Sequence, residues 1–259
     1  MGTDLRHPQA TPAITTLLFD LGNTLIYFDG NWQEVMLRAV EALYQTLLQH
    51  NLNLPTDGFQ ESFWEALNSY YIQREHELKE TTTINLLIEQ LGRYGFSDPE
   101  PELLQSAIGS LYAVTQQHWQ PEKDAQPVLK QLAEKGFRMA LISNASDDQD
   151  VQTLVDKAGI RPYFEIVLSS AAAGIRKPDP EIFWQVLHRM GIKPEMAAMI
   201  GDTLNADILG AQRAGILDIW IYRRVTDAQT LQQQTAIKPS FEIQTLAALP
   251  GLLEKITKA

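Results

Sequence analysis

The 259-residue sequence contains no cysteine, which excludes disulfides, thiolate nucleophiles and cysteine-ligated metal sites. Basic residues are also few, with 21 Lys and Arg against 32 Asp and Glu and a formal net charge of -11 at pH 7. Because a nucleic-acid surface needs clustered Lys and Arg, this balance argues against a nucleic-acid partner. A small anionic substrate remains compatible with it, since a single lysine and a metal ion can set the local field.

Long apolar runs are missing as well. No stretch approaches the roughly 20 apolar residues that a membrane-spanning helix needs, so we expect no membrane association. Residues 1–13 are polar and lack the apolar core of a secretory signal, so we expect a polar N-terminal tail on a cytoplasmic protein. The histidines show no metal-ligand spacing such as H-E-x-x-H.

Short apolar runs that end in a polar residue recur along the chain. They are Ile14–Asp20, Arg138–Ser143, Ile166–Ser170, Ala197–Asp202 and Asp218–Tyr222. Their length and their Ile and Leu content fit strands that are buried on both faces of a parallel sheet. Helical patterns such as Pro180–Met190 lie between them. This alternation predicts an α/β core with a Rossmann-like, doubly wound parallel sheet.

Residues 29–119 follow a different pattern. From Trp32 to Leu48, apolar residues keep an i, i+3, i+4, i+7 rhythm for about four helical turns. Weaker versions of this rhythm follow at Gly58–Tyr71, Thr83–Leu91 and Pro101–His118. We therefore predict an all-helical domain over residues 29–119, inserted into an α/β core made of residues 14–28 and 120–259.

Polar residues stand at the ends of the predicted strands. They are Asp20, Ser143 and Asp202, with Lys177 in the loop after the third run. Taken singly, an Asp or a Ser-Asn after a strand is usually a turn former or helix cap. Taken together, they fall where open parallel sheets bind ligands, beyond the carboxyl ends of the strands. Asp20 and Asp202 offer the hard oxygen ligands that Mg²⁺ prefers, and Lys177 offers a charge for an anion.

Four motifs in a fixed order carry a family resemblance. They are Phe19-Asp20-Leu21-Gly22-Asn23-Thr24-Leu25, Leu141-Ile142-Ser143-Asn144, Gly174-Ile175-Arg176-Lys177-Pro178-Asp179-Pro180 and Gly201-Asp202-Thr203-Leu204-Asn205-Ala206-Asp207. In these motifs, and over nearly its whole length, the sequence resembles the haloacid dehalogenase-like hydrolase superfamily. The predicted helical insertion is similar to that family's cap, a lid that closes over the substrate.

The resemblance implies a role for each motif residue. Asp20 would attack phosphorus to form an aspartyl-phosphate, and Thr24 would steady the loop of this nucleophile. Ser143, Asn144 and Lys177 would bind the substrate, with Ser143 and Lys177 on the transferring phosphoryl group.

The same resemblance implies a metal site and a substrate class. Asp20, Asp202 and the backbone carbonyl of Gly22 would hold Mg²⁺, and Asp207 would orient Lys177 or a metal-bound water. The expected partner is a small phosphorylated metabolite, handled by a monomer or homodimer.

The sequence departs from the family pattern at Gly22, where most phosphatases of the family carry an acid/base Asp. General acid–base catalysis contributes about 10²–10⁴-fold, so we expect a preference for good leaving groups, such as sugar-1-phosphates, acyl phosphates or aryl phosphates. Another acid could come from the insertion, where Glu75, His76, Glu77 and Lys79 form a titratable cluster, although a solvated helix face explains that cluster better.

Three alternatives remain open at this stage. The first is a metal-independent haloacid dehalogenase that uses the same Asp20, against which the acidic Asp202 counts. The second is a phosphonate hydrolase, which would need a lysine of the insertion, such as Lys79, to form a Schiff base. The third is a catalytically weakened relative that serves as a binding or regulatory protein.

Overall fold

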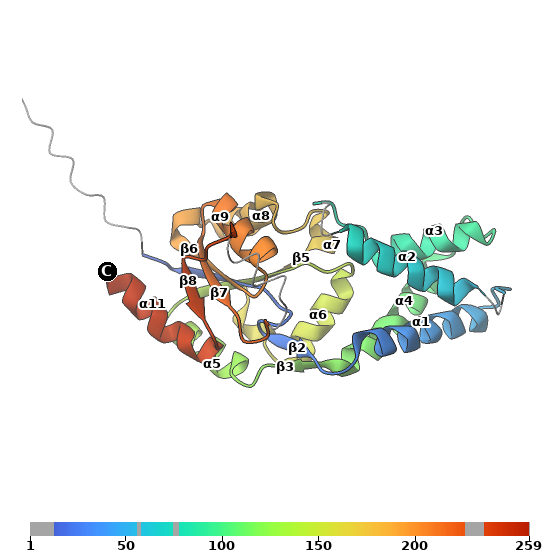
Figure 1. The fold of residues 1–259 in the computed structure, drawn as a ribbon, viewed down its shortest axis with the longest axis horizontal. Coiled ribbons are helices and arrows are strands. Elements are labelled where there is room, and N and C mark those ends of the chain that lie inside the picture. The colour runs from blue at the N-terminus through green and yellow to red at the C-terminus, as the bar shows by residue number, and fades with distance from the viewer. Residues whose placement is uncertain (1–12, 56–57, 75–77, 226–235, 259) are drawn as a thin grey trace, which may run out of the picture.

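A six-stranded parallel sheet forms the centre of the computed structural model (Figure 1). The structure describes residues 13–55, 58–74, 78–225 and 236–258. The sheet has the order β5-β4-β1-β6-β7-β8. Its strands are β1 (Thr16–Phe19), β4 (Arg138–Ser143), β5 (Ile166–Ser169), β6 (Ala197–Gly201), β7 (Leu217–Ile221) and β8 (Phe241–Ile243). The strand order reverses around the central strand β1, as in a doubly wound fold.

Helices cover both faces of this sheet. They are α5 (Ala125–Glu134), α6 (Asp148–Lys157), α7 (Ser170–Ala173), α8 (Pro180–Met190), α9 (Leu209–Ala214) and α11 (Leu249–Lys258). Leu17 and Phe19 of β1 lie in a buried cluster that includes residues of α5, α6 and α11. Leu18 points to the opposite face, in a cluster with residues of α8 and α9. The predicted doubly wound α/β fold is therefore confirmed.

Between β2 (Ile26–Phe28) and β3 (Trp119–Pro121), residues 29–118 form a helical insertion. Its helices are α1 (Trp32–Gln49), α2 (Phe59–Gln73), α3 (Thr83–Arg93) and α4 (Pro101–Thr115), followed by a 3-10 turn at Gln116–His118. These four helices extend away from the sheet in Figure 1 and pack around a separate cluster of buried apolar side chains. The strands β2 and β3 pair antiparallel and connect the insertion to the core. The domain boundaries predicted at residues 28/29 and 119/120 fall at this ribbon and remain predictions.

A second connection joins the insertion to the core beside the sheet. The amide of Thr83 donates to the carbonyl of Ser146 at 2.9 Å, and the amide of Arg176 donates to the carbonyl of Leu78 at 2.9 Å. Residues 78–83 therefore lie against the loops that follow β4 and β5. None of the helices in the described ranges combines the length and hydropathy needed to cross a membrane.

Candidate active site

The carboxyl ends of β1 and β6 bring two acidic residues together. Asp20 follows β1, and its amide donates to the carbonyl of Ile200 at 2.9 Å, which extends the pairing of the two strands. Asp202 follows β6 directly. Because β1 and β6 are neighbours in the sheet, the two carboxylates lie at adjacent strand ends. Asp20 is only 8% exposed, because the central strand places it at the bottom of the site.

Lys177 connects the nucleophile candidate to a second buried carboxylate. Its Nζ lies 2.6 Å from Oδ1 of Asp20 and 2.7 Å from Oδ1 of Asp207. It also donates to the carbonyl oxygen of Ile142 at 2.7 Å. Two hydrogen bonds, to Asp20 and Ile142, and the ion pair with Asp207 therefore fix the position of the ammonium. The adjacent negative charges of Asp20 and Asp207 outweigh burial and raise the pKa of Lys177, so it stays protonated.

Both carboxylate oxygens of Asp207 are held by contacts within the site. Oδ1 pairs with Lys177, and Oδ2 accepts a hydrogen bond from the amide of Thr203 at 2.9 Å. Asp207 lies in a short π-helix, Leu204–Ile208, that packs closely against the end of β6. A Cβ at Gly201 would lie 2.3 Å from the Asp207 carboxyl, so only glycine fits there. This packing gives Asp207 the contacts of a residue that orients Lys177.

Three carboxylates share the site with one lysine. Oxygen atoms of Asp20, Asp202 and Asp207 lie within 4.8 Å of one another. Burial raises the pKa of Asp20 to about 6, although Lys177 partly opposes this shift. Burial and the nearby charges of Asp20 and Asp207 raise the pKa of Asp202 well above its usual range. Because the negative charge exceeds what Lys177 neutralises, and because the donors are hard oxygens, the residues fit a divalent cation such as Mg²⁺.

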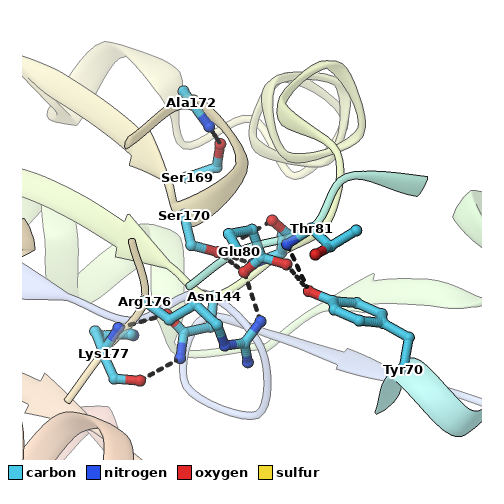
Figure 2. Close-up of polar contacts among 10 residues, drawn as sticks. Tyr70, Glu80, Thr81, Asn144, Ser169, Ser170, Ala172, Arg176 and Lys177 are labelled. Carbon is cyan, nitrogen blue, oxygen red and sulfur yellow. Dashed lines mark hydrogen bonds and ion pairs between the residues drawn. The ribbon is translucent and has the colours of Figure 1, made fainter. Parts of the chain in front are cut away.

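Asn144 binds the loop that carries Lys177. Its Nδ2 donates to the carbonyl of Lys177 at 2.9 Å, and its Oδ1 accepts from the amide of Lys177 at 2.9 Å (Figure 2). We expected Asn144 to bind substrate. In the structure its side-chain amide fixes the backbone from which the lysine projects; Asn144 also lines the cavity, so its role in substrate binding stays a prediction.

Glu80, from the helical insertion, is a residue that sequence reasoning missed. It forms a buried ion pair with Arg176 at 2.5 Å and accepts hydrogen bonds from Ser170 and Tyr70 (Figure 2). Arg176 directly precedes Lys177, so the insertion helps to position the loop that carries this lysine. Nothing in the local sequence separates Glu80 from a solvated glutamate, because all its partners are distant in sequence or on another element.

The remaining predicted residues lie as follows. Ser143 ends β4, is 7% exposed and lines the site cavity, as does Gly22. Thr24 is fully buried, and its hydroxyl has no hydrogen-bond partner in the described part of the chain, so its expected role stays a prediction. Residues 75–77 of the titratable cluster lie outside the described residues. Lys79 is exposed and does not line the cavity.

The site opens into a cavity of about 360 Å³ between the core and the insertion. The core contributes the acidic residues, Ser143 and Lys177 to its wall. The insertion contributes a largely aromatic wall and one cation: Trp32, Met36, Tyr71, Arg74 and Tyr112. Pockets of this size bind small metabolites.

Comparisons with known proteins agree with this geometry. A model of the haloacid dehalogenase-like hydrolase family matches residues 14–215. A glyceraldehyde 3-phosphate phosphatase from Methanopyrus kandleri is 28% identical over 246 residues, which are 95% of this chain and 99% of that protein. A phosphoserine phosphatase from Thermus thermophilus is 38% identical over 100 residues, which are 39% of this chain and 40% of that protein.

A solved structure is similar over almost the same extent. It is the 2-haloacid dehalogenase from Pseudomonas syringae pv. Tomato DC3000, with a TM-score of 0.65 and 26% identity over 94% of this chain and 99% of that one. The chain therefore belongs to the haloacid dehalogenase-like hydrolase family, as its four motifs predict. It is an enzyme of the hydrolase class.

Proposed function

We propose that this protein is a Mg²⁺-dependent phosphatase that hydrolyses a small phosphorylated metabolite through an aspartyl-phosphate on Asp20. The observation that carries the proposal is the placement of Lys177 between Asp20 and Asp207, with Asp202 beside them. A nucleophilic carboxylate next to a fixed cation suits phosphoryl transfer, which depends on positioning and charge stabilisation. The phosphatase names of two relatives support the same assignment.

In the first step, a carboxylate oxygen of Asp20 attacks phosphorus, and the bond from phosphorus to the leaving oxygen breaks. Lys177 and the hydroxyl of Ser143 would bind the phosphoryl oxygens. In the second step, water attacks the aspartyl-phosphate, which releases inorganic phosphate and regenerates Asp20. Asp20, Asp202 and the Gly22 carbonyl would hold Mg²⁺, which when bound supplies positive charge to the phosphoryl group.

Gly22 leaves the first step without a side-chain acid at the position where the family usually has one. We therefore infer that the enzyme favours leaving groups that need little protonation. Acyl and aryl phosphates fit this condition, whereas alkyl phosphates would react more slowly.

A dehalogenase that uses the same Asp20 is the second candidate. The likeness to the Pseudomonas syringae dehalogenase and the lack of an acid at Gly22 favour it. The acidic Asp202 argues against it, because its carboxylate adds negative charge that serves a metal site and has no use in a metal-free displacement of halide.

The test measures phosphate release from acetyl phosphate, p-nitrophenyl phosphate and glyceraldehyde 3-phosphate, with Mg²⁺ and with EDTA, for wild type and Asp20→Asn. We expect Mg²⁺-dependent release that Asp20→Asn abolishes. Release that EDTA leaves unchanged would refute the metal-dependent mechanism. Halide release from a 2-haloacid, without phosphate release from any ester, would assign the dehalogenase function instead.

A further inference from the structure

The cations that line the cavity differ in how they are paired. Among the described residues these cations are Arg74, Arg176 and Lys177. Lys177 is paired with Asp20 and Asp207, and Arg176 is paired with Glu80. Arg74 has no carboxylate within ion-pair distance in the part of the chain that the structure describes. Among the described residues that line the cavity, Arg74 is therefore the cation that forms no ion pair.

Arg74 is nevertheless held in place. It caps the C-terminal end of α2, and its amide donates to the carbonyl of Tyr70 at 2.9 Å. Its guanidinium carbon lies 4.4 Å from the centre of the Tyr71 ring, a cation–π contact that fixes one face of the group. Its Nε is buried and has no hydrogen-bond partner among the described residues. Because the guanidinium lines the cavity without an ion pair to those residues, it can donate to an arriving anion without first breaking an ion pair.

Two acidic residues that line the cavity from the core are already engaged. Asp147 accepts a hydrogen bond from the amide of Asp150 at 2.8 Å and so caps α6. Asp150 accepts one from Nε2 of Gln116 at 2.9 Å. Burial raises the pKa of Asp150 to about 7, so near neutral pH it carries only part of its negative charge. Neither acid pairs with Arg74, and the repulsion of Asp150 toward an anionic substrate is reduced.

We propose that Arg74 binds a second anionic group of the substrate, a carboxylate or a second phosphate, while Asp20 and Lys177 act on the transferring phosphoryl group. The proposal rests on the phosphatase function above and narrows its substrates to small phosphorylated acids or bisphosphates. A planar guanidinium recognises either group through paired N–H donors. Arg74 projects from the insertion and the phosphoryl site lies on the core, so such a substrate would bridge the two walls of the cavity.

The test compares kcat and KM for three substrates with the same number of carbons. Glyceraldehyde 3-phosphate has an uncharged aldehyde, 3-phosphoglycerate has a carboxylate at that carbon, and propane-1,3-diol bisphosphate has a second phosphate. The variants are Arg74→Gln and Arg74→Lys. The matched control is Arg93→Gln, which removes an exposed arginine of the same insertion that pairs with Glu89.

Wild type should prefer at least one anionic substrate over glyceraldehyde 3-phosphate by about tenfold or more in kcat/KM. Arg74→Gln should raise KM for that substrate by roughly 10- to 100-fold, as expected for hydrogen bonds to a charged group. The same variant should change KM for glyceraldehyde 3-phosphate by less than about twofold, because the aldehyde offers no charge to the guanidinium. Arg74→Lys should restore part of the loss, and Arg93→Gln should change nothing. The preferred substrate distinguishes carboxylate from phosphate recognition.

Equal losses on all three substrates would show a structural role for Arg74 and overturn the proposal, as would no change on any of them. A binding measurement tests the role of Arg74 independently of the phosphatase function. Calorimetry with 3-phosphoglycerate and the bisphosphate compares Asp20→Asn with Asp20→Asn/Arg74→Gln, and it needs no turnover. If wild type releases phosphate neither from these three substrates nor from acetyl phosphate, the phosphatase function fails, and the four dissociation constants still decide the role of Arg74.

Discussion

The buried ion pair between Glu80 and Arg176 gives a prediction whose size follows from the structure. Its side chains are 1% and 6% exposed, and it joins the helical insertion to the loop that carries Lys177. Removing one partner of such a pair costs about 3–5 kcal/mol, since the other charge stays buried without compensation. Glu80→Gln should therefore lower the free energy of unfolding by about 3 kcal/mol or more. At roughly 2–4 °C per kcal/mol for a chain of this size, the melting temperature should fall by at least about 6 °C.

A surface pair of the same chemistry provides the control. Arg93 and Glu89 pair on α3 with side chains 58% and 64% exposed, so Glu89→Gln should cost less than about 0.5 kcal/mol. Urea unfolding of wild type and both variants measures the difference. A loss for Glu80→Gln no larger than that for Glu89→Gln would refute the reasoning. The double variant Glu80→Leu/Arg176→Met should lose less than Glu80→Gln, because it leaves no buried charge unpaired.

Three further predictions concern the site itself. Gly22→Asp should raise phosphate release from alkyl phosphates by about tenfold or more, because a Cβ at Gly22 meets only the indole of Trp119 at 3.7 Å, an ordinary contact; a drop on every substrate would contradict this expectation. Lys177→Met should lower kcat by about 10²–10³-fold on acetyl phosphate, since it removes the charge beside the phosphoryl group. The pKa of Asp20 is raised from 3.8 to about 6, so without metal this group contributes stability at pH below about 4 and loses it as pH rises through about 6. Mg²⁺ should consequently raise the melting temperature more at pH 7 than at pH 5, and Asp20→Asn should flatten this difference; an equal effect at both pH values would argue against a metal on these carboxylates.

Much of the α/β core could be predicted from the sequence. The strand Arg138–Ser143 and the helix Pro180–Met190 have the bounds that their apolar patterns predict. The long helix α1 also follows its periodicity closely. The short strand β8 and helix α6 were not predicted, because three apolar residues or a run rich in Asp and Gln carry little periodic signal. The segment after β6 begins as a π-helix, Leu204–Ile208, which packs closely against Gly201.

The residues of the candidate site also fall into those that the sequence predicted and those that it did not. Asp20, Ser143, Lys177 and Asp202 are visible as polar residues after apolar strands, and the resemblance assigns them to one reaction. Their side chains meet because parallel strands end at one edge of the sheet, which a local pattern already implies. Asn144 could be located in this way as well, although its binding to the Lys177 loop could not.

By itself, therefore, the sequence determined the doubly wound core, the helical insertion and the acidic strand ends, because each depends on spacing within a short segment. Only the tertiary structure decided that Glu80 is paired with Arg176 and that Arg74 lines the cavity without a carboxylate partner among the described residues. Whether each of these charged side chains is paired depends on which residues, distant in sequence, come within a few ångströms of it. That distance is set by the packing of the insertion against the core, which no local pattern encodes.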